Sequence, residues 1–250
     1  MADRLTGANQ DTLDDLLING LQVFQARQGY RFSIDAVLLA HFPELGVIKN
    51  IIDIGTGSGV IPLLLSQRTR AAITGIEIQE AMAARAAKSV ELNGLEGQIN
   101  IIRADINQIQ NLLPAGCADL VVSNPPYWKK GEGKLSANPE EAVARHEITL
   151  TLEQLIRQAA YLLVPRGKLA LIQRADRLPE ALQLLTDYRL TAHRLRTVHA
   201  NCRAEARMIL LEAVKGSRSG LKIMPPLCIY QEDGSYSREI EAMYNNEEKN

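Results

Sequence analysis

The stretch NIIDIGTGSG, residues 50–59, decides the fold of this chain. Its apolar, β-branched start predicts a strand over 50–54. The alternating glycines predict a tight turn, because glycine adopts backbone angles that other residues avoid. The run VIPLLLSQRT (60–69) predicts a helix with Pro62 in its first turn. A strand, a glycine-rich turn and a helix indicate a site for a nucleotide-like ligand at the end of the strand.

The same alternation of strand and helix continues through the chain. We expect strands at 71–77, 99–104, 118–123 and 168–173, and helices at 79–92, 152–163 and 178–187. This order predicts an α/β fold with a doubly wound, mostly parallel sheet. The runs at 189–198 and 206–214 predict an antiparallel hairpin at the sheet edge. Ser33 before IDAVLLAHF predicts an N-cap and a helix over 34–42. The acidic tail from Glu232 predicts a surface strand and helix, or a partly disordered end.

The composition of the chain limits its function. The 250 residues are 46% hydrophobic and 23% charged, with a formal net charge of −1, which is typical of soluble globular proteins. No apolar run approaches the roughly 18 residues of a membrane span, and the polar start does not resemble a signal peptide. Three scattered cysteines favour neither a disulfide framework nor a zinc site. We therefore expect a cytoplasmic protein in a reducing compartment.

The spacing within the glycine-rich turn separates two classes of nucleotide enzyme. A dinucleotide fingerprint, G-x-G-x-x-G, needs a glycine where this chain has Val60. Asp53 would also be a poor neighbour for a pyrophosphate, whereas it suits a cationic amino-acid group. The turn therefore disfavours a hydride-transfer enzyme.

Residues 53–59 resemble the D-x-G-x-G-x-G motif of class I S-adenosylmethionine-dependent methyltransferases, which have a seven-stranded, Rossmann-like sheet. Glu77 ends the second strand, 24 residues after Asp53, where that superfamily places an acid on the ribose hydroxyls. Asp105 follows the third strand, where the superfamily uses an acid toward the adenine amino group. The resemblance implies S-adenosylmethionine as the cofactor and the following binding residues in this core: Asp53, Gly55, Thr56, Gly57, Gly59, Glu77, Ile78, Asp105, Ile106 and Asn124.

Asn124-Pro125-Pro126-Tyr127 follows the fourth strand directly. Two prolines fix the backbone, so that the Asn124 side chain and the Pro125 carbonyl can accept hydrogen bonds from a planar NH2 group beside an aromatic ring. These four residues are the predicted catalytic set. A purely structural explanation is that the prolines end the strand and Tyr127 packs in the core. With the upstream glycine motif, the segment resembles the N-P-P-Y motif of amino-group methyltransferases, which act on adenine or glutamine.

Two further segments narrow the resemblance. Residues 28–40 (QGYRFSIDAVLLA) and 144–147 (ARHE) are similar to the bacterial tRNA(valine) adenine-N6-methyltransferase family, and the similarity extends over about residues 15–245. It implies a tRNA partner modified at the adenine next to the anticodon. It also implies that the stretch from Arg31 to Ala36 folds over the cofactor, with Ser33 and Asp35 near the methionine end. Because the sulfonium of the cofactor supplies the electrophile, we expect no metal. We divide the chain into a cover segment with a cofactor-capping helix (1–49), a methyltransferase core (50–230) and an acidic tail (231–250).

Two basic regions are candidates for contact with RNA. The loop after the N-P-P-Y segment forms either an RNA grip or a surface lid, and its candidate substrate-binding residues are Tyr127, Trp128, Lys129, Lys130, Lys134, Arg145 and His146. We assign His146 no catalytic role. Residues 189–222 hold eight Lys and Arg against two acids, and form either a solvated hairpin or a second RNA surface.

Three alternatives to a tRNA adenine methyltransferase remain. Release-factor glutamine N5-methyltransferases share the core motifs, but they carry a larger helical region before the glycine motif than the roughly 50 residues present here. Guanine-N2 RNA methyltransferases usually have a duplicated half. A non-catalytic RNA-binding module on the same fold is disfavoured by the intact acids and N-P-P-Y segment. The sequence leaves the oligomeric state open.

Overall fold

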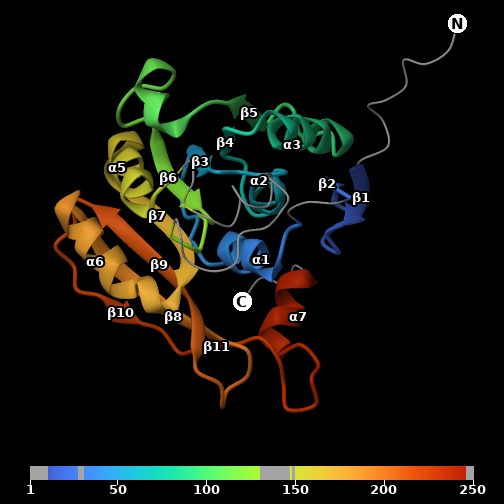
Figure 1. Cartoon of the computed structure of the whole chain (residues 1–250), viewed down its shortest axis with the longest axis vertical. Helices are drawn as coiled ribbons and strands as arrows, with labels where there is room; N and C mark the ends of the chain where they lie inside the picture. The colour runs from blue at the N-terminus through green and yellow to red at the C-terminus, as the bar shows by residue number, and fades with distance from the viewer. Residues whose placement is uncertain (1–10, 28–30, 130–146, 148–149, 246–250) are drawn as a thin grey trace, which may run out of the picture.

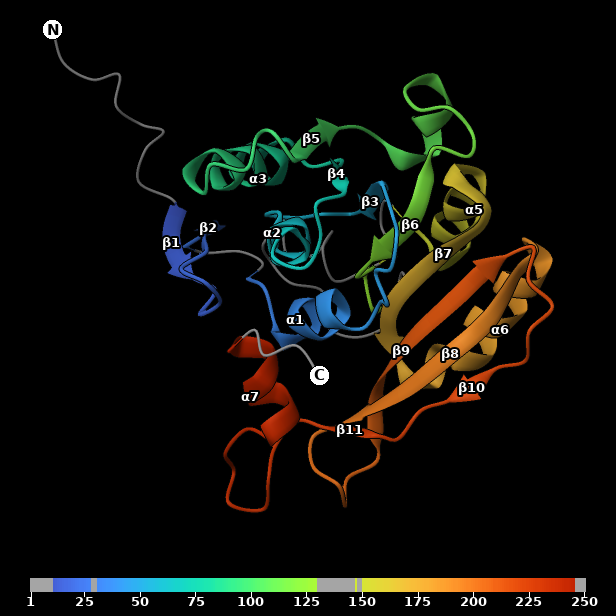
Figure 2. The ribbon, with the colours of Figure 1, turned by 180° about the vertical axis from the view of Figure 1, so that it is seen from behind.

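Seven long strands form the central sheet, in the order β8-β9-β7-β6-β3-β4-β5 (Figure 1). The computed structural model describes residues 11–27, 31–129, 147 and 150–245. The strands are β3 (Asn50–Ile54), β4 (Ala72–Glu77), β5 (Ile99–Arg103), β6 (Ala118–Ser123), β7 (Leu163–Arg174), β8 (Leu190–His199) and β9 (Ala206–Lys215). The two-residue strands β10 (Lys222–Ile223) and β11 (Leu227–Cys228) pair with β8 at the outer edge, as Figure 2 shows from behind.

The pairing confirms the predicted α/β architecture. Strands β3, β4, β5, β6 and β7 pair in parallel, whereas β9 pairs antiparallel with both β7 and β8. The parallel strands are apolar because helices cover both of their faces. In β3, Ile51 packs in the hydrophobic cluster on one face of the sheet, and its neighbour Ile52 packs in the cluster on the other face.

Helices form a layer on each face of the sheet (Figures 1 and 2). One cluster contains residues of α1 (Ile34–His41), α2 (Val60–Ser66), α3 (Glu80–Leu92) and α7 (Arg238–Tyr244). The other contains residues of α5 (Leu152–Leu162), α6 (Leu178–Asp187) and the 3-10 helix η1 (Ile106–Asn111). A second 3-10 turn, η2 (Ala175–Arg177), joins β7 to α6. In the described part of the chain, no helix combines the length and apolarity needed to cross a bilayer.

The main differences from the expected elements have local causes. Ser33 precedes α1 as predicted, but its hydroxyl donates to Asp35 Oδ2 at 2.7 Å and caps no helix N–H. β7 begins at Leu163, five residues before the predicted start, because Leu163 already pairs with Ala118 of β6. An irregularity in that pairing accommodates the Pro165-Arg166-Gly167 segment, in which Arg166 has φ +69°.

An N-terminal hairpin was not predicted from the sequence. β1 (Asp11–Asp15) and β2 (Gln22–Ala26) form a separate antiparallel sheet. The hairpin is attached to α3, because Ser89 Oγ accepts from the Phe24 N–H at 2.9 Å and Asn93 Oδ1 accepts from the Gln22 N–H at 3.0 Å. The polar sequence of β1, DTLDD, lacks the apolar alternation that normally identifies a strand.

The expectation that the cysteines form no disulfide was wrong. Cys202 and Cys228 form a disulfide bond, and their Cα atoms are 5.4 Å apart. Topology brings them together, since β11 pairs with the end of β8 and places Cys228 opposite His199. Sequence spacing hides this proximity, because the two cysteines are 26 residues apart. Cys117 is the free cysteine.

Two arginines of the 189–222 cluster fit neither expectation for it, a solvated hairpin or a second RNA surface. Arg194 and Arg196 are each only 9% exposed. Arg194 lies 3.1 Å from Glu44 and 3.6 Å from Glu212, and Arg196 forms a bidentate ion pair with Glu239 at 2.6 and 2.8 Å. Each guanidinium group is therefore paired with carboxylates of the same chain, of which Glu212 is fully buried and Glu44 is largely exposed.

Candidate active site

A cleft opens where the carboxyl ends of β3, β4, β5 and β6 meet. This edge is where ligands bind in parallel α/β sheets. The predicted cofactor and acceptor residues that line the cleft are Gly55, Thr56, Gly57, Glu77, Ile78, Asp105, Ile106, Asn124, Pro125 and Pro126. Ten further lining residues were not predicted from the sequence: Phe32, Ile54, Ser58, Val60, Ile61, Ile76, Gln79, Met82, Ala104 and Leu150. Phe32 lies between the predicted residues Arg31 and Ser33, and this position in the sequence could have identified it as a lining residue.

The glycine-rich turn is pinned to the neighbouring strand. The N–H groups of Gly55 and Thr56 both donate to the Ile76 carbonyl, at 2.9 and 3.0 Å. Gly59 has φ +86°, and a Cβ atom there would lie 3.2 Å from the Ala86 Cβ, so a side chain would be strained and crowded. At Gly55 and Gly57, which line the cleft, the turn therefore presents main chain without a side chain.

Two acids at consecutive strand ends are held in fixed orientations. Glu77 is 6% exposed and accepts from the N–H groups of Gly57 and Gln79, each at 2.9 Å through a different carboxylate oxygen. Asp105 Oδ1 accepts from the Asn107 N–H at 2.8 Å and caps η1. Both carboxylates keep lone pairs for a ligand, since an ionised carboxylate can accept about four hydrogen bonds.

Asp53 lies beneath the turn and is fully buried. Its side chain does not line the cleft, and neither carboxylate oxygen has a hydrogen-bond partner among the described residues. Burial raises the pKa of Asp53 to about 7; the Thr56 side chain opposes this shift, and the negative charge of Glu77 adds to it. A buried carboxyl without a partner is costly unless a cation stabilises its charge. A cationic ligand group above the turn fits this requirement.

The acceptor segment, residues 124–127, contributes Asn124, Pro125 and Pro126 to one wall of the cleft. Tyr127 joins this segment to α1 by a hydrogen bond. The Tyr127 hydroxyl lies 2.7 Å from Asp35 Oδ2 and 2.8 Å from Asn124 Oδ1. Pro125 is buried, and the Pro126 carbonyl accepts from Gln173 Nε2 at 3.5 Å. The backbone is therefore fixed from both sides, and the side chain of Asn124 reaches the cleft.

The three predicted cover residues, Arg31, Ser33 and Asp35, make different contacts. Arg31 is turned toward the hairpin, where it forms an ion pair with Asp14 and donates to Thr12 Oγ1 at 3.2 Å. Ser33 and Asp35 are joined to each other and, through Asp35, to Tyr127. None of these three cover residues lines the cleft. Phe32 is the cover residue that does.

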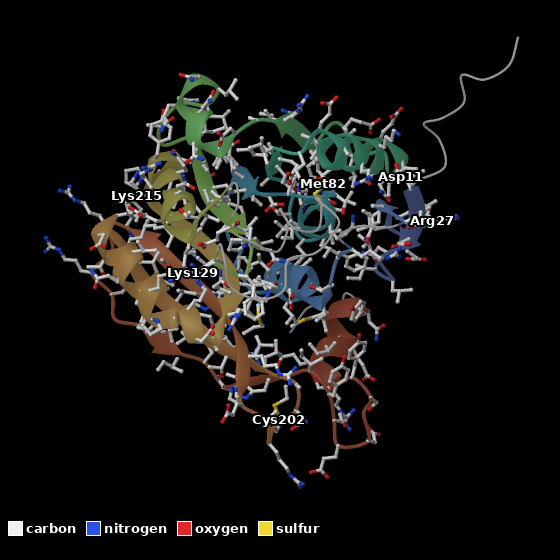
Figure 3. All side chains as sticks on the ribbon, viewed as in Figure 1. Asp11, Arg27, Met82, Lys129, Cys202 and Lys215 are labelled. Carbon is white, nitrogen blue, oxygen red and sulfur yellow. A yellow bond between two sulfur atoms is a disulfide. The ribbon has the colours of Figure 1, made fainter. Side chains whose placement is uncertain are left out.

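The start of the basic loop is held by α6 and the end of β7. The Arg174 guanidinium lies 3.8 Å from the centre of the Trp128 ring, and Lys129 pairs with Glu180 at 3.1 Å (Figure 3 labels Lys129). Lys129 therefore contacts a carboxylate. Lys130, Lys134, Arg145 and His146 lie outside the described residues.

Comparison with known proteins identifies the family. Residues 33–194 match the family model of the methyltransferase small domain. The chain belongs to this family. It is 36% identical over 189 residues to the tRNA1(Val) (adenine(37)-N6)-methyltransferase of Porphyromonas gingivalis, covering 73% of each chain. A relative with the same name from Photobacterium profundum is 31% identical over 219 residues, covering 86% of this chain and 90% of the relative.

A solved structure supports the fold of this methyltransferase. A predicted O-methyltransferase from Agrobacterium tumefaciens superposes with a TM-score of 0.69 at 24% identity, covering 84% of this chain and 95% of its own. This family member is therefore an S-adenosylmethionine-dependent methyltransferase with a Rossmann-like fold. The cleft fits that cofactor, because it combines a bare glycine turn, two oriented carboxylates and a buried carboxyl beneath the turn.

Proposed function

We propose that this methyltransferase transfers a methyl group from S-adenosylmethionine to the exocyclic N6 amine of an adenine in tRNA, next to the anticodon. The observation that carries the proposal is that Asn124, Pro125 and Pro126 line the same cleft as Glu77 and Asp105. The names of relatives more than 30% identical to this chain support the same acceptor.

The residues at the floor of the cleft would hold the cofactor. Glu77 would accept from the ribose hydroxyls and Asp105 from the adenine amine, while Gly55, Thr56, Gly57 and Gly59 leave room for the amino-acid end. Asp53 would attract the cofactor's ammonium group from beneath the turn. When bound, the cofactor supplies an electrophilic methyl group on a sulfonium, so alignment is the main task of the protein.

The acceptor segment would align the amine. Asn124 Oδ1 and the Pro125 carbonyl would each accept one N–H of the planar amine, and the Tyr127 ring would stack on the base. Two acceptors favour a more tetrahedral nitrogen whose lone pair faces the methyl group. Methyl transfer would form the nitrogen–carbon bond as the carbon–sulfur bond breaks, and the nitrogen would then release one proton to water. The products are the N6-methylated adenine and S-adenosylhomocysteine.

The RNA would approach from the side of the basic loop. Trp128 offers a stacking surface, and Lys129 can exchange its Glu180 partner for a phosphate. Lys130, Arg145 and His146 of the same loop complete the proposed substrate-binding set.

Parallel incubations test the acceptor class. Purified protein with methyl-labelled S-adenosylmethionine receives unmodified total tRNA in one tube and unmodified release factor in the other. The proposal predicts label in tRNA only. Label in the glutamine of the release factor would contradict it, although the same acceptor residues would then serve an amide nitrogen.

A further inference from the structure

The acceptor segment and the two ends of the basic loop contact one short stretch of chain, residues 173–180, which runs from the end of β7 through η2 into α6. Gln173 donates to the Pro126 carbonyl at 3.5 Å, and Arg174 lies against the Trp128 ring. Gln173 is fully buried, and its Oε1 also accepts from the Arg174 N–H at 2.8 Å. We call residues 173–180 the template segment.

Charged contacts extend this arrangement to both ends of the loop. Glu180 pairs with Lys129 at the start of the loop at 3.1 Å. Arg177 pairs with Glu147 at the other end at 2.7 Å, and with Glu180 at 2.9 Å. Lys129, Glu180, Arg177 and Glu147 thus form one continuous chain of alternating charges.

The two loop ends are also joined directly. The Glu147 N–H donates to the Trp128 carbonyl at 2.8 Å, and Glu147 Oε1 accepts from the Leu152 N–H at 2.9 Å, near the start of α5. Glu147 therefore contacts the acceptor side, the template segment and α5 at once. The position of the Glu147 side chain therefore depends on the positive charge of Arg177, which faces it.

Arg177 supplies that charge from a buried position. Its side chain is 6% exposed and that of Glu147 is 9% exposed, so neither charge can be replaced easily by water. Removing one partner of a buried ion pair leaves the other charge uncompensated, and this displaces it or the backbone that carries it. The lysine of the Lys129–Glu180 pair is about half exposed, so this pair contributes less to fixing the loop ends than the buried pair does.

We propose that Arg177 is a positioning residue for methyl transfer, which fixes Trp128 and the acceptor segment by clamping Glu147 to the template segment. This inference rests on the proposed function for its kinetic test only. Arg177 acts through Glu147 and Trp128, and it contacts neither the cofactor cleft nor the acceptor.

The fluorescence of Trp128 tests the positioning without reference to activity. Trp128 is the single tryptophan of the chain, so its emission, excited where tyrosine does not absorb, reports on this one site. Arg177→Ala is expected to shift the emission to longer wavelength and to increase quenching by acrylamide. The matched control is Arg203→Ala, which removes the exposed pair with Glu232 and is expected to leave Trp128 unchanged.

Kinetics test the consequence for the reaction. Arg177→Ala is expected to lower kcat/KM for tRNA by about tenfold to 100-fold, which is the scale for a catalytic geometry displaced by about 1 Å. The Kd for S-adenosylmethionine, measured by calorimetry, is expected to stay unchanged. Arg177→Lys keeps a positive charge near Glu147 and is expected to restore part of the lost kcat/KM.

Two results would overturn this inference. One is an Arg177→Ala variant with wild-type Trp128 emission and wild-type kcat/KM. The other is equal impairment of Arg177→Lys and Arg177→Ala. If Arg177→Ala fails to fold, Glu147→Gln, which keeps the shape and removes the paired charge, provides the same emission and kinetic readouts. An inactive wild-type enzyme on tRNA would contradict the proposed function instead, and the emission test would still decide the role of Arg177.

Discussion

The hydroxyl of Tyr127 lies 2.7 Å from the carboxylate of Asp35, a residue 92 positions earlier in the chain. The same hydroxyl lies 2.8 Å from Asn124 Oδ1, and Asp35 also accepts from Ser33 Oγ. Because one phenolic proton can satisfy only one acceptor fully, Asp35 can hold it and leave Asn124 available to the substrate amine. The N-terminal cover is therefore linked to the acceptor segment by this hydrogen bond.

We expect Asp35→Ala to reduce methyl transfer about tenfold, since the Tyr127 ring loses the bond that orients it. Asp35→Asn keeps an acceptor oxygen and is expected to retain most activity. Tyr127→Phe keeps the stacking ring and loses the same bond, so it is expected to resemble Asp35→Ala, whereas Tyr127→Ala should be far worse. Steady-state rates on tRNA check this order. Additive losses in the Asp35→Ala, Tyr127→Phe double variant would contradict the link.

Asn124→Ala is expected to abolish methyl transfer and leave the Kd for S-adenosylmethionine nearly unchanged. The variant removes one of the two acceptors for the amine, while the carboxylates and the glycine turn stay in place. Single-turnover rates and calorimetry measure the two quantities separately. Asn100→Ala, on the exposed side of β5, is the matched control. Substantial turnover by Asn124→Ala would remove the role proposed for this side chain.

Asp53 predicts a specific pH dependence of stability. Burial raises its pKa from the ordinary value of 3.8 to about 7 in the folded protein. Between about pH 4 and pH 7 the folded protein binds a proton that the unfolded chain does not, so the free energy of unfolding falls as pH rises through this window. The slope is at most about 1.4 kcal/mol per pH unit, and the contribution levels off above pH 7.

Asp53→Asn removes this titration and serves as the comparison. Urea unfolding between pH 5 and pH 8, a range of about three units around the shifted pKa, should show the stability of the variant rising relative to wild type as pH increases. Parallel curves for the two proteins would show that Asp53 titrates at its ordinary value.

Much of the fold could be predicted because each core element has a strong local signal. β6 and α6 match their predicted bounds, and β3 ends at the predicted glycine turn. The N-terminal hairpin could not be predicted, since its first strand is polar and its second strand is held by hydrogen bonds to Ser89 of α3 and to Asn93 just after it. Long-range pairing of this kind has no signature in local periodicity.

The candidate site shows the same division. Strand-end residues such as Glu77 and Asp105 follow from the alternation of elements, because parallel strands end at one edge. The position of Arg31 does not follow from the order of elements, because it depends on an ion pair with Asp14 of the hairpin. The burial of Arg194 and Arg196 likewise depends on Glu44, Glu212 and Glu239, three carboxylates contributed from far along the chain. A count of basic residues gives the charge of a segment, but it does not show which carboxylates pair with those residues.

The Cys202–Cys228 bond is expected to stabilise the protein by about 3 kcal/mol, because it closes a loop of 26 residues in the unfolded chain. Reduction, or Cys202→Ser, should lower the free energy of unfolding by that amount and leave methyl transfer unchanged. Figure 3 shows Cys202 near the bottom of the molecule and Met82, which lines the cleft, in its upper half. Cys117→Ser is the control. Equal urea midpoints with and without reductant would show that the bond contributes nothing.

The central claim is that the amine of an adenine in tRNA accepts the methyl group. The most direct measurement is mass spectrometry of nucleosides from unmodified tRNA treated with wild-type protein and with Asn124→Ala. We expect N6-methyladenosine from the wild-type reaction alone, located after nuclease mapping at the adenine next to the anticodon. Methylation of a different base, or N6-methyladenosine from both proteins, would contradict it.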